Sequence, residues 1–229
     1  MADERALAAV RELEADDDRV AAALATVAEL HDAVATLRGR ATATRELLAS
    51  GPARAGEAAA RVAEAEAELG RRREEQAAAE RELADAERSR DEDRRARALR
   101  VLERARDRVA SGERRLERAV ARRADLDRAL HDAEAAVPLL EDDAHALAAR
   151  LRDVPRVSAS GLQAPGAGLD GVDEWASRAL AALLVVRSGL EAERERLIRQ
   201  ANELAAIVLG EPGVATTVTL VRGRLERAG

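Results

Sequence analysis

Residues 102–151 read LERARDRVASGERRLERAVARRADLDRALHDAEAAVPLLEDDAHALAARL. Apolar residues recur there at alternating steps of three and four, in one set that begins with Leu102 and Val109 and a second that begins with Ala105. This spacing is typical of the a and d positions of a coiled coil. Pro138 interrupts the pattern without shifting its phase, which favours a kinked but continuous helix over a break.

The same heptad spacing occupies the N-terminal part of the chain, where Val20, Val27 and Val34 form one set of positions. The pattern stops at Ser50-Gly51-Pro52, where Ser can cap a helix, Gly can turn and Pro suits the first turn of a new helix. We therefore predict a turn at 50–52. The heptads resume at Ala55, and the two seams interlock as an antiparallel hairpin when the numbers of facing residues add up to 106.

Towards the C-terminus, residues 153–171 carry prolines, glycines and serines without a helical period, which indicates a linker. A further helix begins near Asp170 or Asp173 and extends to Leu209, and we expect it to pack antiparallel on 102–151 with facing numbers that add up to 320. For the tail, residues 214–227, a short helix is favoured over a strand.

These patterns predict an all-α protein: an elongated antiparallel coiled coil of helical hairpins built on one long central helix, residues 53–152, with a short C-terminal helical segment. A shorter bundle of the same helices is the alternative. The expected parts are an N-terminal antiparallel hairpin (1–98), a continuation of the long helix (99–152), a linker (153–171), and a C-terminal helix with a tail helix packed back on 102–151 (172–229).

The composition agrees with thin helical seams and excludes several chemistries. Of 229 residues, 47% are hydrophobic and 36% charged, with no Phe or Tyr and one Trp. The chain is arginine-rich and lysine-free, and it has no Cys. It therefore lacks the Lys of a P-loop or Schiff base and every thiolate nucleophile or zinc ligand.

The location of the protein is predicted from what the sequence lacks. Its first residues are acidic, unlike a secretory signal, and the longest apolar run, Ala179–Val186, is far shorter than the roughly 20 residues of a bilayer span. We therefore expect a cytoplasmic protein without a membrane span.

No residues are predicted to be catalytic, cofactor-binding or metal-binding. His131 and His145 share a heptad position, with Asp142 three residues before His145. A metal site of the carboxylate-bridged kind needs more Glu and His side chains from several helices. Solvated histidines are the better interpretation, and no nucleophile lies in a strand-turn-helix or Gly-rich turn. We predict that the protein is not an enzyme and needs no cofactor.

One segment is strongly basic, although the whole chain has a net charge of −6. Residues 94–123 contain twelve arginines and four acids. This basic patch is a candidate for nucleic acid or anionic lipid, although no aromatic residues interleave it to stack bases. The alternative is internal neutralisation by the acidic residues 1–18. The patch consists of Arg94, Arg95, Arg97, Arg100, Arg104, Arg106, Arg108, Arg114, Arg115, Arg118, Arg122 and Arg123.

The predicted self-association surface surrounds the sole aromatic residue, Trp175, and the run 179–186, which is apolar on every face. A helix that is apolar all round must be covered on more than one side, and Trp is a frequent interface anchor. Either the tail folds over this run or another chain covers it, and we favour self-association as a homo-oligomer, most simply a dimer. The candidate residues are Trp175, Leu180, Leu183, Leu184, Val185, Val186, Leu190, Leu197 and Leu204.

The leading functional hypothesis is a non-enzymatic coiled-coil scaffold or adaptor that acts through self-association and protein–protein contacts. The Ala/Arg/Glu-rich heptads of residues 13–151 also resemble the coiled-coil arms of the structural maintenance of chromosomes family, which implies a DNA-associated accessory as an alternative. A hairpin of long helices followed by shorter ones is broadly similar to phage-shock and ESCRT-III-like proteins. That resemblance implies membrane remodelling as a third alternative.

Overall fold

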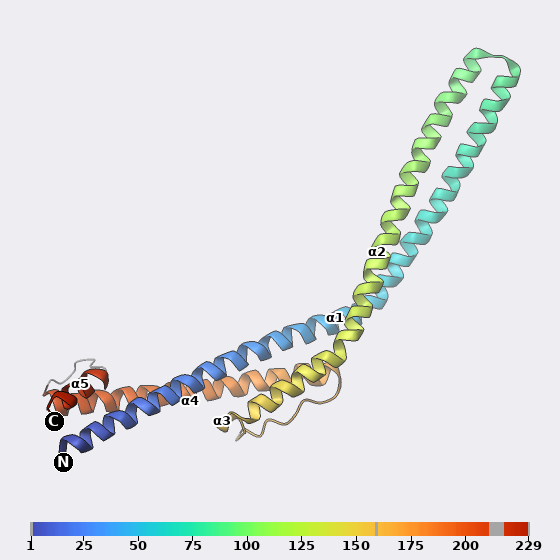
Figure 1. Ribbon diagram of the computed structural model, residues 1–229. Helices are drawn as coiled ribbons and strands as arrows, with labels where there is room; N and C mark the ends of the chain where they lie inside the picture. Colours follow the sequence, from blue (N-terminus) through green and yellow to red (C-terminus); the bar gives the residue numbers. More distant parts are fainter. Residues whose placement is uncertain (1, 159, 211–217, 229) are drawn as a thin grey trace. The chain divides into compact units, whose positions relative to one another are not determined.

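The computed structural model describes residues 2–158, 160–210 and 218–228 of the chain (Figure 1). Every regular element in this part is helical, which confirms the predicted all-α fold. The helices are α1 (Ala2–Ser89), α2 (Glu92–Arg152), α3 (Pro155–Ser158), α4 (Gly168–Leu209) and α5 (Val218–Ala228).

The chain forms two compact units that divide it differently from the predicted parts. Unit 1 consists of Met1–Thr42 and Val137–Gly229, and unit 2 consists of Ala43–Ala136. Helices α1 and α2 contribute residues to both units.

Unit 2 is an antiparallel hairpin of the second half of α1 and the first half of α2 (Figure 1). Arg108 pairs with Glu75, Arg115 pairs with Glu64, and Gly51 faces Leu130, so the numbers of facing residues add up to about 181. The seam is narrow and contains many alanines. Leu83, Leu116, Leu126 and Leu130, at predicted seam positions, are half-buried. Nine other apolar residues at heptad positions are buried: Ala58, Val62, Ala65, Leu69, Ala79, Ala86, Leu102, Ala105 and Val109.

The predicted turn at 50–52 is wrong, because α1 continues through Ser50, Gly51 and Pro52 without interruption. The buried Gly51 backbone packs against Leu130 of α2, where a side chain on residue 51 would collide. Pro52 is exposed, so its ring and missing N–H face solvent. Tertiary packing thus retains a helix that the local residues disfavour. The predicted central helix 53–152 does not form, and neither does the predicted hairpin in which the numbers of facing residues add up to 106.

The actual turn of the hairpin is at Arg90 and Asp91, between α1 and α2. Arg90 has φ 57°, a left-handed conformation that usually favours Gly or Asn. The Asp91 carboxylate accepts a hydrogen bond from the backbone N–H of Arg94 at 3.0 Å, so Asp91 is the N-cap of α2. Helix α2 then runs through Pro138 to Arg152, which confirms the predicted continuity.

Unit 1 packs three long segments together: the start of α1, the end of α2, and α4. Helix α4 is antiparallel to α1, because Asp173 near its start pairs with Arg38 and Arg194 near its end pairs with Asp17. The Gly168 N–H donates to Glu141 of α2 at 2.6 Å, so α4 starts well before the end of α2 and runs parallel to it. The predicted antiparallel packing of α4 on 102–151 is therefore wrong.

The chain between α2 and α4 reverses direction once more, which makes the parallel packing possible. Helix α3 lies in this segment, and an ion pair between Arg156 and Glu193 joins it to α4. Helix α4 begins at Gly168, before the predicted caps, and ends at Leu209 as predicted, with Gly210 at φ 72°.

The tail is helical over Val218–Ala228, which confirms the favoured interpretation for these residues; residues 214–217 lie outside the described part. Helix α5 does not pack on 102–151 as we predicted. Its Val221 and Leu225 contact Val10 of α1 and Ala205 of α4. Once α4 runs antiparallel to α1, its C-terminal end lies beside the N-terminal end of α1, and α5 covers both.

Candidate interaction surfaces

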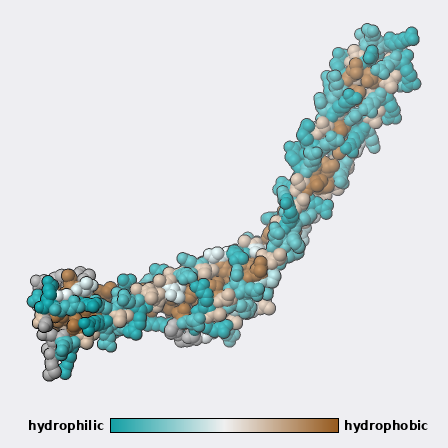
Figure 2. Space-filling view, viewed as in Figure 1, coloured by the Kyte–Doolittle hydropathy of each residue, from teal (hydrophilic) through white to brown (hydrophobic). Residues whose placement is uncertain are grey.

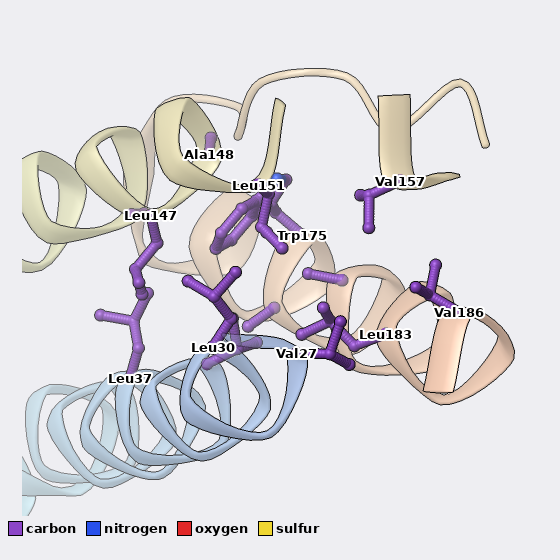
Figure 3. Close-up of a cluster of buried hydrophobic side chains, with 14 of the residues drawn as sticks. Val27, Leu30, Leu37, Leu147, Ala148, Leu151, Val157, Trp175, Leu183 and Val186 are labelled. Atoms are coloured by element: carbon purple, nitrogen blue, oxygen red, sulfur yellow. The ribbon is translucent and has the colours of Figure 1, made fainter. Parts of the chain in front are cut away.

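Trp175 is the centre of the unit 1 core and is not part of a surface. Figure 3 shows its indole beside Leu151 of α2 and Leu30 of α1, with Val157 of α3 close by. The side chain is 0% exposed, and its Nε1 has no hydrogen-bond partner in the part of the chain that the structure describes. The protein thus buries its one aromatic ring among its own aliphatic side chains.

Most of the predicted self-association surface is internal for the same reason. Leu183, Val186, Leu190 and Leu197 are buried in the core with Trp175, and Leu180 and Leu204 are partly buried against apolar neighbours. We expected one antiparallel neighbour to leave these residues uncovered. Instead, α4 contacts α1, α2 and α3, and α5 at its end, so the chain covers them itself.

Two predicted residues remain available for contacts: Leu184 is 53% exposed and Val185 is 74% exposed. The structure adds Ile198 and Ile207 on the same helix, which are 49% and 81% exposed. Both lie outside the seam of buried residues on α4. An apolar residue at such a solvent-facing position was the sequence signal that could have identified them. Leu184 and Ile198 are two heptads apart and share one side of α4.

A groove of about 580 Å³ lies between α1, α4 and α5 in unit 1. Apolar residues and several polar groups line it, among them Glu14, Asp17 and Arg222. Arg222 pairs with Glu14 at 3.0 Å, and its pKa is raised by the hydrogen bond to Glu226 and by the nearby charges of Glu14 and Glu226. The groove was not predictable from the sequence, since it depends on where α5 packs.

Four arginines of the predicted basic patch are neutralised within unit 2. Arg95 lies 3.8 Å from Glu87, Arg108 and Arg115 each lie 3.2 Å from a glutamate of α1, and Arg123 lies 3.7 Å from its helical neighbour Asp127. We expected neutralisation by residues 1–18. That segment belongs to unit 1, where Glu14 and Asp17 pair with arginines of α5 and α4.

The other eight arginines of the patch form no side-chain hydrogen bond or ion pair with any described residue, and all are exposed. They are Arg94, Arg97, Arg100, Arg104, Arg106, Arg114, Arg118 and Arg122. Figure 2 shows that the surface of the hairpin is mostly hydrophilic, with small hydrophobic patches between the hydrophilic side chains.

A polar cluster interrupts the apolar seam of unit 2 at Arg72. Its Nε donates to Glu68 at 2.9 Å, and its Nη1 donates to the Arg108 carbonyl oxygen across the hairpin at 3.0 Å. The hydrogen bonds from Arg71 and from Arg72 lower the pKa of Glu68. The guanidinium of Arg72 therefore joins the two helices of the hairpin through a hydrogen bond.

The histidines are not assembled into a site. His131 and His145 are exposed, and His145 Nδ1 lies 2.7 Å from the Glu141 carbonyl oxygen of its own helix. Among the described residues, no three His, Asp or Glu side chains are close enough together to hold a metal ion. The absence of metal, cofactor and enzymatic activity stays a prediction.

Among the described residues, one helix meets a length and composition criterion for crossing a membrane. Within α1, an 18-residue window has a mean hydropathy of 1.4, and 28% of it is buried in the protein. Core helices meet the same criterion, and α1 packs its valines and leucines against α2 and α4. The cytoplasmic location also stays a prediction.

No family model, no curated protein and no solved structure matches this chain.

Proposed function

We propose that this protein is a non-enzymatic coiled-coil scaffold or adaptor that self-associates and contacts other proteins through the outer faces of its helices. The observation that supports the proposal best is the construction of unit 2. It is a two-helix hairpin whose buried apolar side chains form a single seam, so most of its residues face solvent. Such an arm presents surface along its length and encloses little volume in which chemistry can proceed.

The energetics of the arm favour a role that involves partners. Near its tip the buried cluster consists of Ala79, Leu102 and Ala105, with Leu83 packed beside it. Apolar burial contributes about 25 cal/mol per Å², and alanines contribute little area. A helix pair of this kind gains stability from each further surface that packs against it.

Self-association is assigned to the exposed aliphatic side chains of α4. Leu184 and Val185 are adjacent and 53% and 74% exposed, so they place two apolar groups on the side of α4 that faces away from its buried residues Leu183 and Val186. Inside the chain these side chains add little to stability. A second copy that buries them removes apolar surface from water, which favours a dimer.

The test is the molar mass in solution of Leu184→Glu/Val185→Glu, measured by sedimentation equilibrium from 1 to 100 µM beside the wild type. Both positions are exposed, so the fold is expected to survive, and circular dichroism checks this. The control, Ala60→Glu/Ala67→Glu, adds the same charge at two exposed positions of unit 2. We expect a concentration-dependent dimer for the wild type and the control, and a monomer for the α4 variant.

Two results would contradict the proposal. A wild type that remains monomeric over this concentration range has no self-association to explain. A dimer that persists with both glutamates in place uses a different surface, and the assignment to Leu184 and Val185 is then wrong.

A further inference from the structure

Five of the unpaired arginines lie in a line on the outer face of α2 in unit 2. With the buried Leu102 and Ala105 at heptad positions a and d, the outward positions are b, c and f; position b carries Ala96, Glu103, Ala110 and Glu117, and the arginines gather at c and f. Between residues 97 and 118 positions c and f hold five arginines, one aspartate, Asp107, and one serine, Ser111. We call the five the arginine stripe: Arg97, Arg100, Arg104, Arg114 and Arg118.

The stripe differs in kind from the arginines beside the seam. Arg95, Arg108 and Arg115 flank the seam and reach glutamates of α1, so their charge is used inside the hairpin. The stripe points away from α1 and reaches none of its acids. The equivalent outer positions of α1 mix acids, alanines and arginines, so the hairpin has one basic edge and no second one.

The stripe is unfavourable for the helix that carries it. Arg97 and Arg100, Arg100 and Arg104, and Arg114 and Arg118 are three or four residues apart, and like charges at these spacings destabilise a helix. Asp107 lies within the stripe, Asp93 lies four residues before Arg97, and Glu103 and Glu117 flank one side, so these acids offset part of the repulsion. A polyanion bound along the face would remove this repulsion.

We propose that the arginine stripe binds the phosphate backbone of duplex DNA without sequence preference. The guanidinium fork matches phosphate oxygens, and Arg stays charged at any physiological pH. From residue 97 to residue 118 an α-helix rises about 32 Å, close to the roughly 34 Å of one turn of the duplex. The inference does not depend on the dimer contact, which lies in the other unit.

The surroundings of the stripe favour duplex DNA over other polyanions. Binding of single strands relies on aromatic stacking, and the only aromatic residue of the chain, Trp175, is buried in unit 1. Insertion into a lipid surface needs bulky apolar side chains beside the cations. The exposed Leu99, Val101 and Val120 of α2 lie at positions that flank the seam, whereas the outer face beside the stripe carries Ala96 and Ala110. Two packed helices, about 20 Å across, are too wide for the roughly 12 Å major groove, so the contact is with the backbone.

The test measures binding of a fluorescein-labelled 30-base-pair duplex of arbitrary sequence by fluorescence anisotropy at 50–200 mM NaCl. Five phosphate contacts predict a slope of about −4.5 in a plot of log affinity against log salt concentration, or about a 500-fold loss over this range. We expect Arg97→Gln/Arg100→Gln/Arg104→Gln to weaken binding at 50 mM NaCl about tenfold or more and to bring the slope to about −2.

The matched control is Arg54→Gln/Arg61→Gln/Arg81→Gln, which removes three exposed arginines from α1 of the same unit and changes the net charge equally. It should bind as the wild type does. Arg97→Lys/Arg100→Lys/Arg104→Lys keeps the positive charge and should keep the slope of the salt dependence. If circular dichroism shows that the Gln variant loses helicity, the Lys variant tests whether the stripe binds the duplex through its charge.

Three outcomes would overturn the proposal. The first is a wild type that does not bind the duplex at 50 mM NaCl. The second is an equal loss of binding in the α1 control, which would reduce the effect to net charge. The third is binding to vesicles containing 30% phosphatidylglycerol, or to single-stranded DNA, in place of the duplex.

Discussion

Gly51→Ala tests the register of the unit 2 hairpin most directly. A Cβ on residue 51 would lie 2.0 Å from Leu130 Cδ2, 3.0 Å from Leu130 Cγ and 3.2 Å from Leu130 Cδ1. Because the Cγ atom is also too close, rotation of the leucine end is not sufficient, and either Leu130 or the helix pair must shift. Gly56, five residues later in the same helix, has open space where a Cβ would lie, with no atom within 4 Å, and serves as the control.

The expected magnitude combines two opposing effects. Replacing Gly by Ala inside a helix stabilises it by about 1 kcal/mol, and this alone applies to Gly56→Ala. Forcing an extra methyl group into a packed contact costs about 1–3 kcal/mol. We therefore expect Gly56→Ala to raise the free energy of unfolding by about 1 kcal/mol and Gly51→Ala to fall below Gly56→Ala by about 1–3 kcal/mol.

Urea unfolding followed by circular dichroism at 222 nm measures both variants, and a double-mutant cycle with Leu130→Ala isolates the contact. Without the leucine methyl groups, the Gly51→Ala change should stabilise the protein as much as Gly56→Ala does. Equal stability of the two single variants would refute the close approach of residues 51 and 130, and with it the observed register.

Three further predictions follow from individual side chains. Trp175→Ala should cost about 3–5 kcal/mol by thermal unfolding and Trp175→Phe much less, because Phe fills most of the site and removes a buried N–H without a partner; equal losses would contradict this. Asp91→Ala should cost about 1 kcal/mol by removing the N-cap of α2, and Asp93→Ala less. Because its arginine hydrogen bonds lower the pKa of Glu68, the stability that Glu68 adds is complete above its unfolded pKa of 4.5 and declines as pH falls through the lower folded value. The difference in melting temperature between wild type and Glu68→Gln should therefore shrink from pH 7 to pH 3, and a constant difference would show that ionisation is irrelevant.

The apolar seams were predictable from the sequence because they depend on local spacing alone. Val20, Val27 and Val34 in the first segment, and Leu102, Ala105 and Val109 in the second, were all placed at heptad positions and are buried. A period of three and four residues states which face of a helix is covered. It does not state which other helix covers it, because every Ala- and Leu-rich seam fits every other one about equally well.

The turns were harder to predict because their strongest local signals conflict with tertiary packing. Gly51-Pro52 disfavours a helix on its own, yet the contact with Leu130 retains one. At the true turn, Arg90 occupies a left-handed conformation without being Gly or Asn. The acidic run that starts at Asp91 was the available signal, since it supplies a cap and favourable charges at the start of a helix.

The direction of α4 could not be derived from its own residues. We expected the linker to reverse the chain once, whereas the segment between Arg152 and Gly168 returns along α2 before α4 begins. Fifteen residues reach about 50 Å when extended, far more than this return needs. Once three helices surround Trp175, the surface predicted around it becomes core, and only Leu184 and Val185 stay exposed.

The register of the unit 2 hairpin, in which the numbers of facing residues add up to about 181, determines which deletions can shorten the arm. A deletion of one heptad from α1 alone would leave every later residue opposite the wrong partner. Removal of residues 65–71 together with residues 110–116, which face one another in this register, preserves the phase on both sides of the cut and shortens the arm by about 10 Å. Relatives of this chain are therefore expected to gain or lose heptads in mirrored pairs about the Arg90–Asp91 turn.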